Sequence, residues 1–130
     1  MLGIQSKTKN RHNLLENKVA FVTGAGSGIG RAGAMAMASH GAHVVVTDLF
    51  AEKAHQVADA IKSQGYLASS HGFDVTEDTA FDFLFKDTVD RFGRLDILHS
   101  QAGYQIEGNL EQVSIEGMDL SWKLNVRSHF

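Results

Sequence analysis

Four glycines fall within seven positions of the stretch FVTGAGSGIGRAGA, directly after an apolar segment: Gly24, Gly26, Gly28 and Gly30. A turn without side chains at the start of a helix lets a phosphate reach the unpaired N–H groups at the positive helix end. A single glycine would be explained by a tight turn that needs a positive φ angle. Four in this place favour a phosphate-binding turn, so the sequence predicts a nucleotide site.

The spacing of the glycines narrows the kind of nucleotide. No lysine follows any of them, which excludes the P-loop. The strict Gly-x-Gly-x-x-Gly fingerprint is also missed, because Ile29 stands where its third glycine should be. The stretch matches Thr-Gly-x3-Gly-x-Gly, starting at Thr23, and also the looser Gly-x-Gly-x-Gly of methyltransferases that bind S-adenosylmethionine.

Two acidic residues follow later strands of the predicted sheet. Asp48 comes 18 residues after Gly30, where a carboxylate can accept both hydroxyls of an adenosine ribose and would repel a 2′-phosphate. This role of Asp48 favours NAD over NADP. The alternative role is structural: the side chain of Asp48 would only cap the turn that follows the strand. Asp74 and Val75 offer a side-chain acceptor beside a backbone N–H, which suits the edge of an adenine ring.

Strand-like and helix-like segments alternate along the chain and would position these residues. We expect strands at 18–23, 43–48, 66–73 and 94–100, and helices at 28–40, 51–63, 77–92 and from 114 onward. Such alternation predicts a parallel sheet between layers of helices. We expect a polar leader (1–17) and one nucleotide-binding domain (18–130), with the aromatic stripes, including Trp122, in its core.

Composition excludes several other functions. The chain has 130 residues, a formal net charge of −3 and no cysteine. It shows no apolar run of membrane-spanning length, no secretory signal and no dense basic stripe, so we expect a cytoplasmic protein without a membrane or nucleic-acid partner. The seven histidines do not have zinc-site spacing, and no metal site is expected.

Taken together, these motifs resemble the short-chain dehydrogenase/reductase family over nearly the whole chain after the leader. The resemblance is carried by KVAFVTGAGSGIG (18–30), Asp48, Asp74–Val75, SQAG (100–103) and LNV (124–126). It implies a Rossmann-like, doubly wound parallel sheet in the order 3-2-1-4. It also implies hydride transfer between NAD(H) and a small alcohol or ketone, by an enzyme that is a homo-oligomer when complete.

The resemblance also implies a role for individual residues. The segment from Gly24 through Ile29 to Gly30 would cradle the pyrophosphate, and Ser27 would add a hydroxyl contact. Three residues of SQAG would line the path of the ribose and the middle of the cofactor: Ser100, Ala102 and Gly103. Asn125 would be the helper of the catalytic tetrad, holding a water in the proton relay.

The sequence departs from the family in two ways. Ser100 and Gln101 stand in place of two asparagines, which puts the side-chain bracing of the fourth strand in doubt. The family's Tyr-x3-Lys is absent, because the two tyrosines are followed at the fourth position by Ser70 and Gly108. We therefore expect an incomplete, inactive cofactor-binding half that lacks the catalytic Ser, Tyr and Lys, and that self-associates through an open strand edge and the surface of Trp122.

Two other functions stay open at this stage. A methyltransferase would share the glycines and both acidic residues, although Val22 occupies the place of its usual acidic residue before the first glycine. A non-catalytic nucleotide-binding module would explain the missing tyrosine and lysine.

Overall fold

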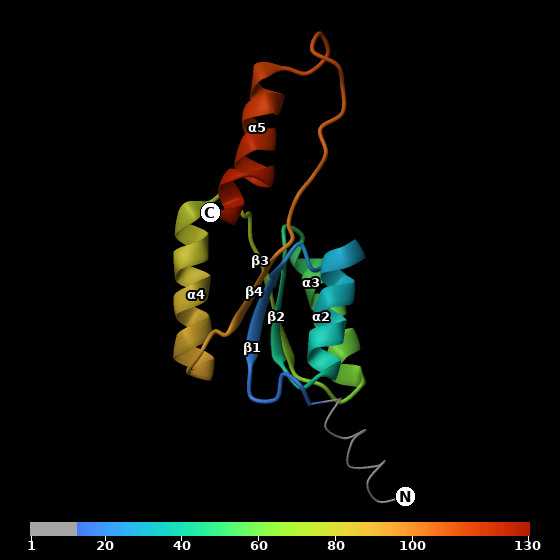
Figure 1. The fold of residues 1–130 in the computed structure, drawn as a ribbon, viewed down its shortest axis with the longest axis vertical. Helices are drawn as coiled ribbons and strands as arrows, with labels where there is room; N and C mark the ends of the chain where they lie inside the picture. Colours follow the sequence, from blue (N-terminus) through green and yellow to red (C-terminus); the bar gives the residue numbers. More distant parts are fainter. Residues whose placement is uncertain (1–12) are drawn as a thin grey trace, which may run out of the picture.

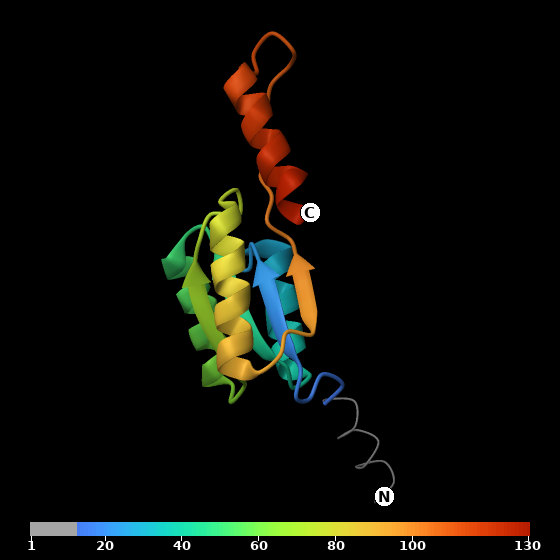
Figure 2. The same cartoon turned by 90° about the vertical axis from the view of Figure 1, so that its left-hand side faces the viewer.

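The computed structural model of the chain describes residues 13–130, so most of the expected leader lies outside the described residues. Four parallel strands form one sheet in the order β3-β2-β1-β4. They are β1 (Val19–Thr23), β2 (His43–Asp48), β3 (Ala68–Gly72) and β4 (Ile97–Ser100). The predicted strand order is confirmed, and all four carboxyl ends point to the same edge of the sheet (Figure 2).

Helices cover both faces of this sheet (Figure 1). The helices that the structure describes are α2 (Gly28–Ser39), α3 (Ala51–Ser63), α4 (Asp78–Phe92) and α5 (Ile115–Asn125), followed by the short 3-10 helix η1 (Arg127–His129). Helices α2 and α3 lie on one face and α4 on the other, which gives the predicted Rossmann-like α/β arrangement. Among residues 13–130, no helix combines the length and apolar character that crossing a bilayer requires.

The central strand β1 is apolar on both sides, as a covered parallel strand must be. Ala20 and Val22 pack in a cluster with residues of α2 and α3, whereas Val19 and Phe21 pack toward α4. The ring of Phe21 meets an aromatic neighbour on α4, Phe85, edge to face with centroids 4.9 Å apart. The two clusters fix the sheet between its helices and so fix the edge at which the strands end.

Strand β4 begins at Ile97 and not at residue 94 as expected, because the residues before it form a turn that is held by side-chain hydrogen bonds. The carboxylate of Asp96 accepts hydrogen bonds from Arg94 and, at 2.8 Å, from the backbone N–H of Val19. These interactions hold the pKa of Asp96 at about 2, well below its usual range, with the Arg94 hydrogen bond as the largest cause. The turn before β4 is thereby fixed to the start of β1, and the strand proper is limited to Ile97–Ser100.

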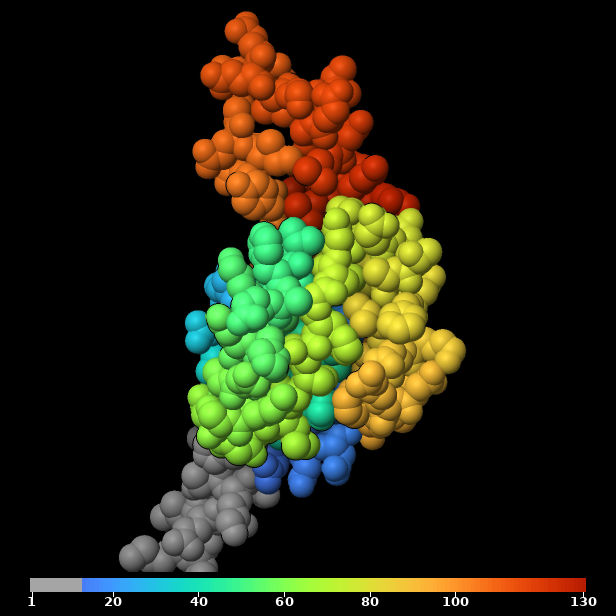
Figure 3. Space-filling view, turned by 180° about the vertical axis from the view of Figure 1, so that it is seen from behind, coloured from blue at the N-terminus to red at the C-terminus, as the bar shows by residue number. Residues whose placement is uncertain are grey.

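Helix α5 and the chain that leads to it project from the body beyond the carboxyl ends of the strands (Figures 1 and 3). No residue of α5 is buried, and Trp122 is 61% exposed. The expectation that Trp122 lies in the core is therefore wrong, and its exposure agrees instead with the expectation of a bare Trp122 surface that followed from the missing Tyr-x3-Lys region. The segment after α5 is held to the body by Arg127, which forms an ion pair with Asp78 at the start of α4.

Candidate nucleotide-binding site

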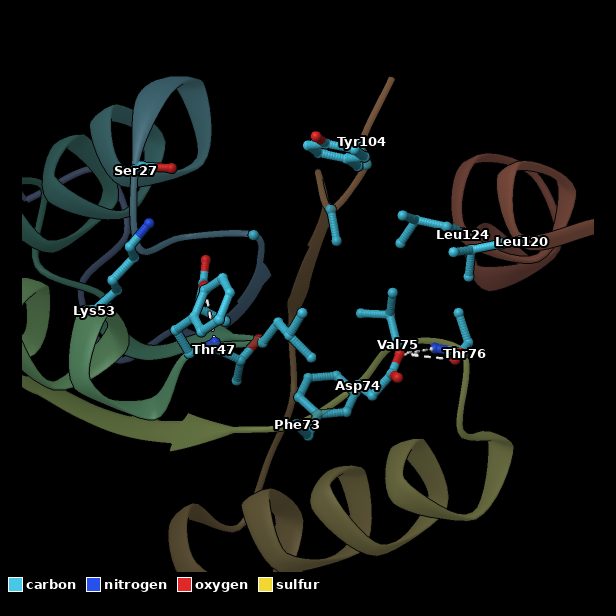
Figure 4. A pocket seen from close by; sticks show the side chains of 16 residues that line it. Ser27, Thr47, Lys53, Phe73, Asp74, Val75, Thr76, Tyr104, Leu120 and Leu124 are labelled. Atoms are coloured by element: carbon cyan, nitrogen blue, oxygen red, sulfur yellow. Dashed lines mark hydrogen bonds between the residues drawn. The ribbon is translucent and has the colours of Figure 1, made fainter. Parts of the chain in front are cut away.

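A cavity of about 680 Å³ opens at the carboxyl ends of the strands, where α5 faces the sheet (Figure 4). Its volume lies within the range of about 300–1,000 Å³ that is usual for small-molecule pockets. The lining comes from the loop after β1, the end of β2 with the start of α3, the chain after β3, the chain after β4, and α5. Ligands of open α/β sheets bind at this edge.

The glycine loop needs its glycines for shape and for space. Gly24 and Gly28 have φ angles of +62° and +56°, which side-chain-bearing residues rarely adopt. A Cβ on Gly24 would lie 2.8 Å from the Cα of Ala102, so the loop packs closely against the chain after β4. A Cβ on Gly28 would meet no atom within 4 Å, so the space in front of this position is open to a ligand.

The start of α2 is suited to an anion. Ser27 occupies the N-cap position in an extended conformation, and its hydroxyl makes no capping hydrogen bond. The first turn of α2 contains no acidic residue. The N–H groups of that turn have no intrahelical partner, so they can donate to a phosphate beside the Ser27 hydroxyl.

Asp48 lies beside the glycine loop and lines the cavity. Its Oδ2 accepts from the backbone N–H of Gly26 at 3.0 Å, and its Oδ1 accepts from that of Phe50 at 3.0 Å. The carboxylate therefore also fixes the turn into α3, as the capping alternative had it. Each oxygen keeps further lone pairs, so the two N–H bonds orient the carboxylate without using all its acceptor capacity.

The chain after β3 is held by Asp74, whose Oδ1 accepts from the N–H of Thr76 at 2.9 Å and from its hydroxyl at 2.8 Å. Val75 is buried and lines the cavity. Phe73 connects this lining to the core, since its ring meets Phe21 and Phe81 edge to face. The wall that holds the Asp74–Val75 pair is thus anchored in the hydrophobic core.

The chain after β4 is braced by a residue of β1. Thr23 is buried, and its hydroxyl oxygen accepts from the N–H groups of Gln101 and Ala102 at 3.0 and 3.1 Å. The side chain of Gln101 lies 3.1 Å from Nε2 of His99. The bracing that the sequence put in doubt is therefore present, from Thr23 and a His–Gln pair.

Asn125 holds the base of the projecting segment. Its amide donates to the carbonyl of Tyr104 at 2.9 Å and accepts from the N–H of the same residue at 2.9 Å. A further donation reaches Ser121 at 3.2 Å. Both amide protons are thus engaged, and the Oδ1 atom keeps one further lone pair, so this side chain can only accept a hydrogen bond from the water that the resemblance implies.

The structure brings most of the expected cofactor-binding residues to one cavity. Seven of them line it: Gly24, Ser27, Asp48, Asp74, Val75, Ala102 and Gly103. Four others do not line it. Gly28 and the exposed Ile29 lie at the start of α2, outside the lining, and Gly30 is buried beneath Gly24. The hydroxyl of Ser100 lies within 2.5 Å of Nδ1 of His129.

Sequence reasoning missed the remaining lining residues, which are Thr47, Leu49, Phe50, Lys53, Phe73, Thr76, Tyr104, Leu120 and Leu124. Proximity in the chain to Asp48, Asp74 or Gly103 could have found several of them. Nothing local marks Leu120 and Leu124, which reach the cavity only because α5 faces the sheet edge. Within residues 13–130, no three histidine, aspartate or glutamate side chains gather as a metal-binding group.

Comparisons with known proteins agree with this geometry. The family model described as "short chain dehydrogenase" matches residues 18–130. An uncharacterized oxidoreductase of Thermotoga maritima is 41% identical over 115 residues, which cover 88% of this chain and 45% of the relative. A versicolorin reductase of Emericella nidulans is 42% identical over 117 residues, covering 89% of this chain and 44% of the relative.

Solved structures show the same likeness. A citronellol catabolism dehydrogenase of Pseudomonas aeruginosa superposes with a TM-score of 0.87 at 32% identity, covering 92% of this chain and 49% of that one. A hydroxysteroid dehydrogenase of Escherichia coli gives 0.84 at 34% identity, covering 92% and 51%. The chain thus spans about half the length of the relatives it matches. It belongs to the short-chain dehydrogenase/reductase family.

Proposed function

We propose that this chain is the cofactor-binding part of an oxidoreductase that transfers hydride between NAD(H) and a small alcohol or ketone. One observation carries the proposal. A single cavity contains a glycine loop at a helix start, a carboxylate at the end of the neighbouring strand, and an Asp–Val pair at the end of the strand after that. The family and its oxidoreductase members support the reaction class.

The residues of this cavity fit a dinucleotide from one end to the other. Ser27 and the first N–H groups of α2 would bind the pyrophosphate, in the open space in front of Gly28. Asp48 would accept the ribose hydroxyls, and its carboxylate favours the cofactor without a 2′-phosphate. Asp74 and Val75 would bind the adenine edge, while Ala102 and Gly103 would border the middle of the cofactor.

The bound nicotinamide would supply or accept the hydride; the protein must orient the substrate and move a proton. General acid–base catalysis needs a titrating group within hydrogen-bond reach of the substrate oxygen. Asn125 does not titrate in this range, and its side chain is engaged with Tyr104. We infer that the proton-transfer groups come from outside these 130 residues, and that the residues themselves are inactive in turnover. A homo-oligomeric, cytoplasmic enzyme remains a prediction.

Ligand-dependent thermal stability tests the proposal, because a ligand that binds only the folded state stabilises it by about 2.7 kcal/mol at a hundred times its Kd. We expect NAD to raise the Tm and S-adenosylmethionine to leave it unchanged. A rise with S-adenosylmethionine alone would favour the methyltransferase alternative and overturn the proposal.

A pair of matched variants shows whether the stabilisation depends on the start of α2. Gly28→Asp places a carboxylate in the space reserved for the pyrophosphate, so the rise of Tm with NAD should disappear. Gly65→Asp is the control: Gly65 also has a positive φ angle and no atom within 4 Å of a Cβ, but it lies in the loop between α3 and β3, away from the start of α2 where the pyrophosphate would bind. An unchanged NAD effect in Gly28→Asp would show that the pyrophosphate binds elsewhere.

A further inference from the structure

We propose that His43 and His71 form a pH-sensitive fastening between the sheet and helix α4, which holds the helix while both rings are neutral and loosens it when they take up protons. The two histidines lie on neighbouring strands, β2 and β3. Neither of them lines the nucleotide cavity, so this device does not depend on the proposed function.

Strand register places both side chains on the face of the sheet that α4 covers (Figure 2). His43 is paired with Val19, which packs toward α4, so the two side chains share that face. His71 is paired with Thr47, which lies four positions after His43 on the same strand and therefore on the same face. Two titratable rings thus lie next to each other between the sheet and a single helix.

The ring of His43 packs against the last residue of α4. Its centroid lies 4.1 Å from that of the Phe92 ring, with an angle of 38° between the two planes. The Nε2 atom lies 3.4 Å from the hydroxyl of Ser69 on β3. In the part of the chain that the structure describes, no carboxylate comes within 4 Å of the ring nitrogens of His43, whereas the exposed His55 has Asp59 at 3.2 Å. A proton on His43 would therefore form no ion pair.

Charged groups from the surrounding elements face His43 with both signs. They are Glu16, Lys18 and Arg94, which line a pocket with it, and Lys62 of α3. Arg94 is already paired with Asp96, so one carboxylate is opposed by two ammonium groups. The carboxyl end of α4 and the face of the Phe92 ring favour a cation. Burial of the ring opposes it: burial first and the charge of Lys62 second lower the pKa of His43 below its usual value.

His71 faces the second half of α4, where Asp87 and Arg91 lie. These two side chains form an ion pair at 2.9 Å, so the guanidinium offsets part of the attraction of the carboxylate for a protonated ring. Burial is the largest influence on His71 and lowers its pKa, with Asp87 raising it and Arg91 lowering it to smaller extents. Both histidines are therefore neutral near pH 7 while α4 is in place.

Detachment of α4 would return both rings to water, where a histidine takes up its proton near pH 6.5. The detached state therefore binds more protons as the pH falls, and the attachment is strongest above about pH 7 and weakens below it. From pH 7.5 to 5.5, a ring that stays neutral in the fold shifts the equilibrium toward detachment by at most about tenfold. The loosening would reach the nucleotide cavity, since Phe73 of its lining packs edge to face on Phe81 of α4.

Hydrogen exchange of the α4 amides, corrected for the pH dependence of intrinsic exchange, tests the device. In wild type we expect the protection factors of α4 to fall at least about threefold from pH 7.5 to 5.5, with a limit of about a hundredfold for two histidines. The double variant His43→Phe, His71→Gln keeps a ring against Phe92 and a polar group beside α4, but neither residue titrates. Its α4 protection should change less than about twofold over the same interval.

His55→Gln is the matched control, because it removes an exposed histidine from the surface of α3 and should keep the full effect of pH on α4. A loss below threefold in wild type, or a loss that persists in the double variant, would overturn the fastening. Imidazole NMR signals of wild type give a measurement that needs no variant. Both rings should titrate with midpoints below pH 6.5, and midpoints at or above that value would also overturn the proposal.

Discussion

Gly30→Ala tests the most constrained contact of the glycine loop. Gly30 is buried in α2, and a Cβ at this position would collide with the carbonyl oxygen of Gly24 and lie 2.8 Å from its carbonyl carbon. The Cα of Ala25 would be 3.1 Å away. All three obstacles are backbone atoms, so no side-chain rotation can relieve the clash.

The expected magnitude follows from two opposing terms. Overpacking of a core costs about 1–3 kcal/mol, and more where the neighbour cannot move. Replacing glycine by alanine inside a helix returns up to about 1 kcal/mol. Because the neighbour here is backbone, we expect a net loss of at least about 2 kcal/mol in the free energy of unfolding.

Urea unfolding followed by circular dichroism measures this loss. Gly117→Ala serves as the control: Gly117 is also inside a helix, but its nearest neighbour is the Ser114 hydroxyl at 3.2 Å, which can give by a few tenths of an ångström while it still accepts from the Gly117 N–H as the N-cap. This control should be as stable as wild type or slightly more so. If Gly30→Ala unfolded within about 0.5 kcal/mol of wild type, the close packing of the β1–α2 turn on α2 described above would be refuted, since surface-like changes have that size.

Three further outcomes are expected. Thr23→Val removes the acceptor of two backbone N–H groups and should cost about 2 kcal/mol in urea unfolding, whereas Thr23→Ser should cost less than half of that. The pKa of Asp96 is held at about 2, mainly by the hydrogen bond from Arg94. This carboxylate therefore stabilises the fold above pH 4, and the stabilisation is lost as the pH falls from 4 toward 2. Asp96→Asn should flatten the dependence of the unfolding midpoint on pH in this window. Asn125→Ala should speed hydrogen exchange at the Tyr104 amide without moving the urea midpoint of the body, and unchanged exchange would contradict the double contact of this asparagine.

The strands and helices could be predicted from the alternating hydrophobic pattern of the sequence, whereas the order of the strands in the sheet came from the resemblance to the family. Val44, Val45 and Val46 are fully or almost fully buried, as a strand covered on both faces requires. The exposure of Trp122 could not be predicted from its spacing on α5, which is typical of a core stripe, because burial depends on which element packs over that helix. The hydrophobic pattern of a segment predicts which face of its helix is apolar, whereas the element that packs on that face is set by the tertiary structure.

The candidate site shows the same division. The positions of Gly24, Asp48 and Asp74 follow from parallel topology, which gathers the ends of successive strands at one edge. The turn of the Ser100 hydroxyl to His129 and the bracing by Thr23 do not follow, because each joins residues far apart in the sequence. Lys53 was missed for a different reason: its place in the lining depends on the angle at which α3 leaves the end of β2.

The paired contacts between the Asn125 amide and the Tyr104 backbone give the projecting segment a mechanical property. They close the 22 residues from Tyr104 to Asn125 into a loop that is fastened at its base. Tyr104 directly follows Gly103, so a tilt of α5 pulls on the cavity edge near the glycine loop. The helix and this part of the cavity edge are therefore mechanically linked, in addition to the lining that Leu120 and Leu124 of α5 supply directly.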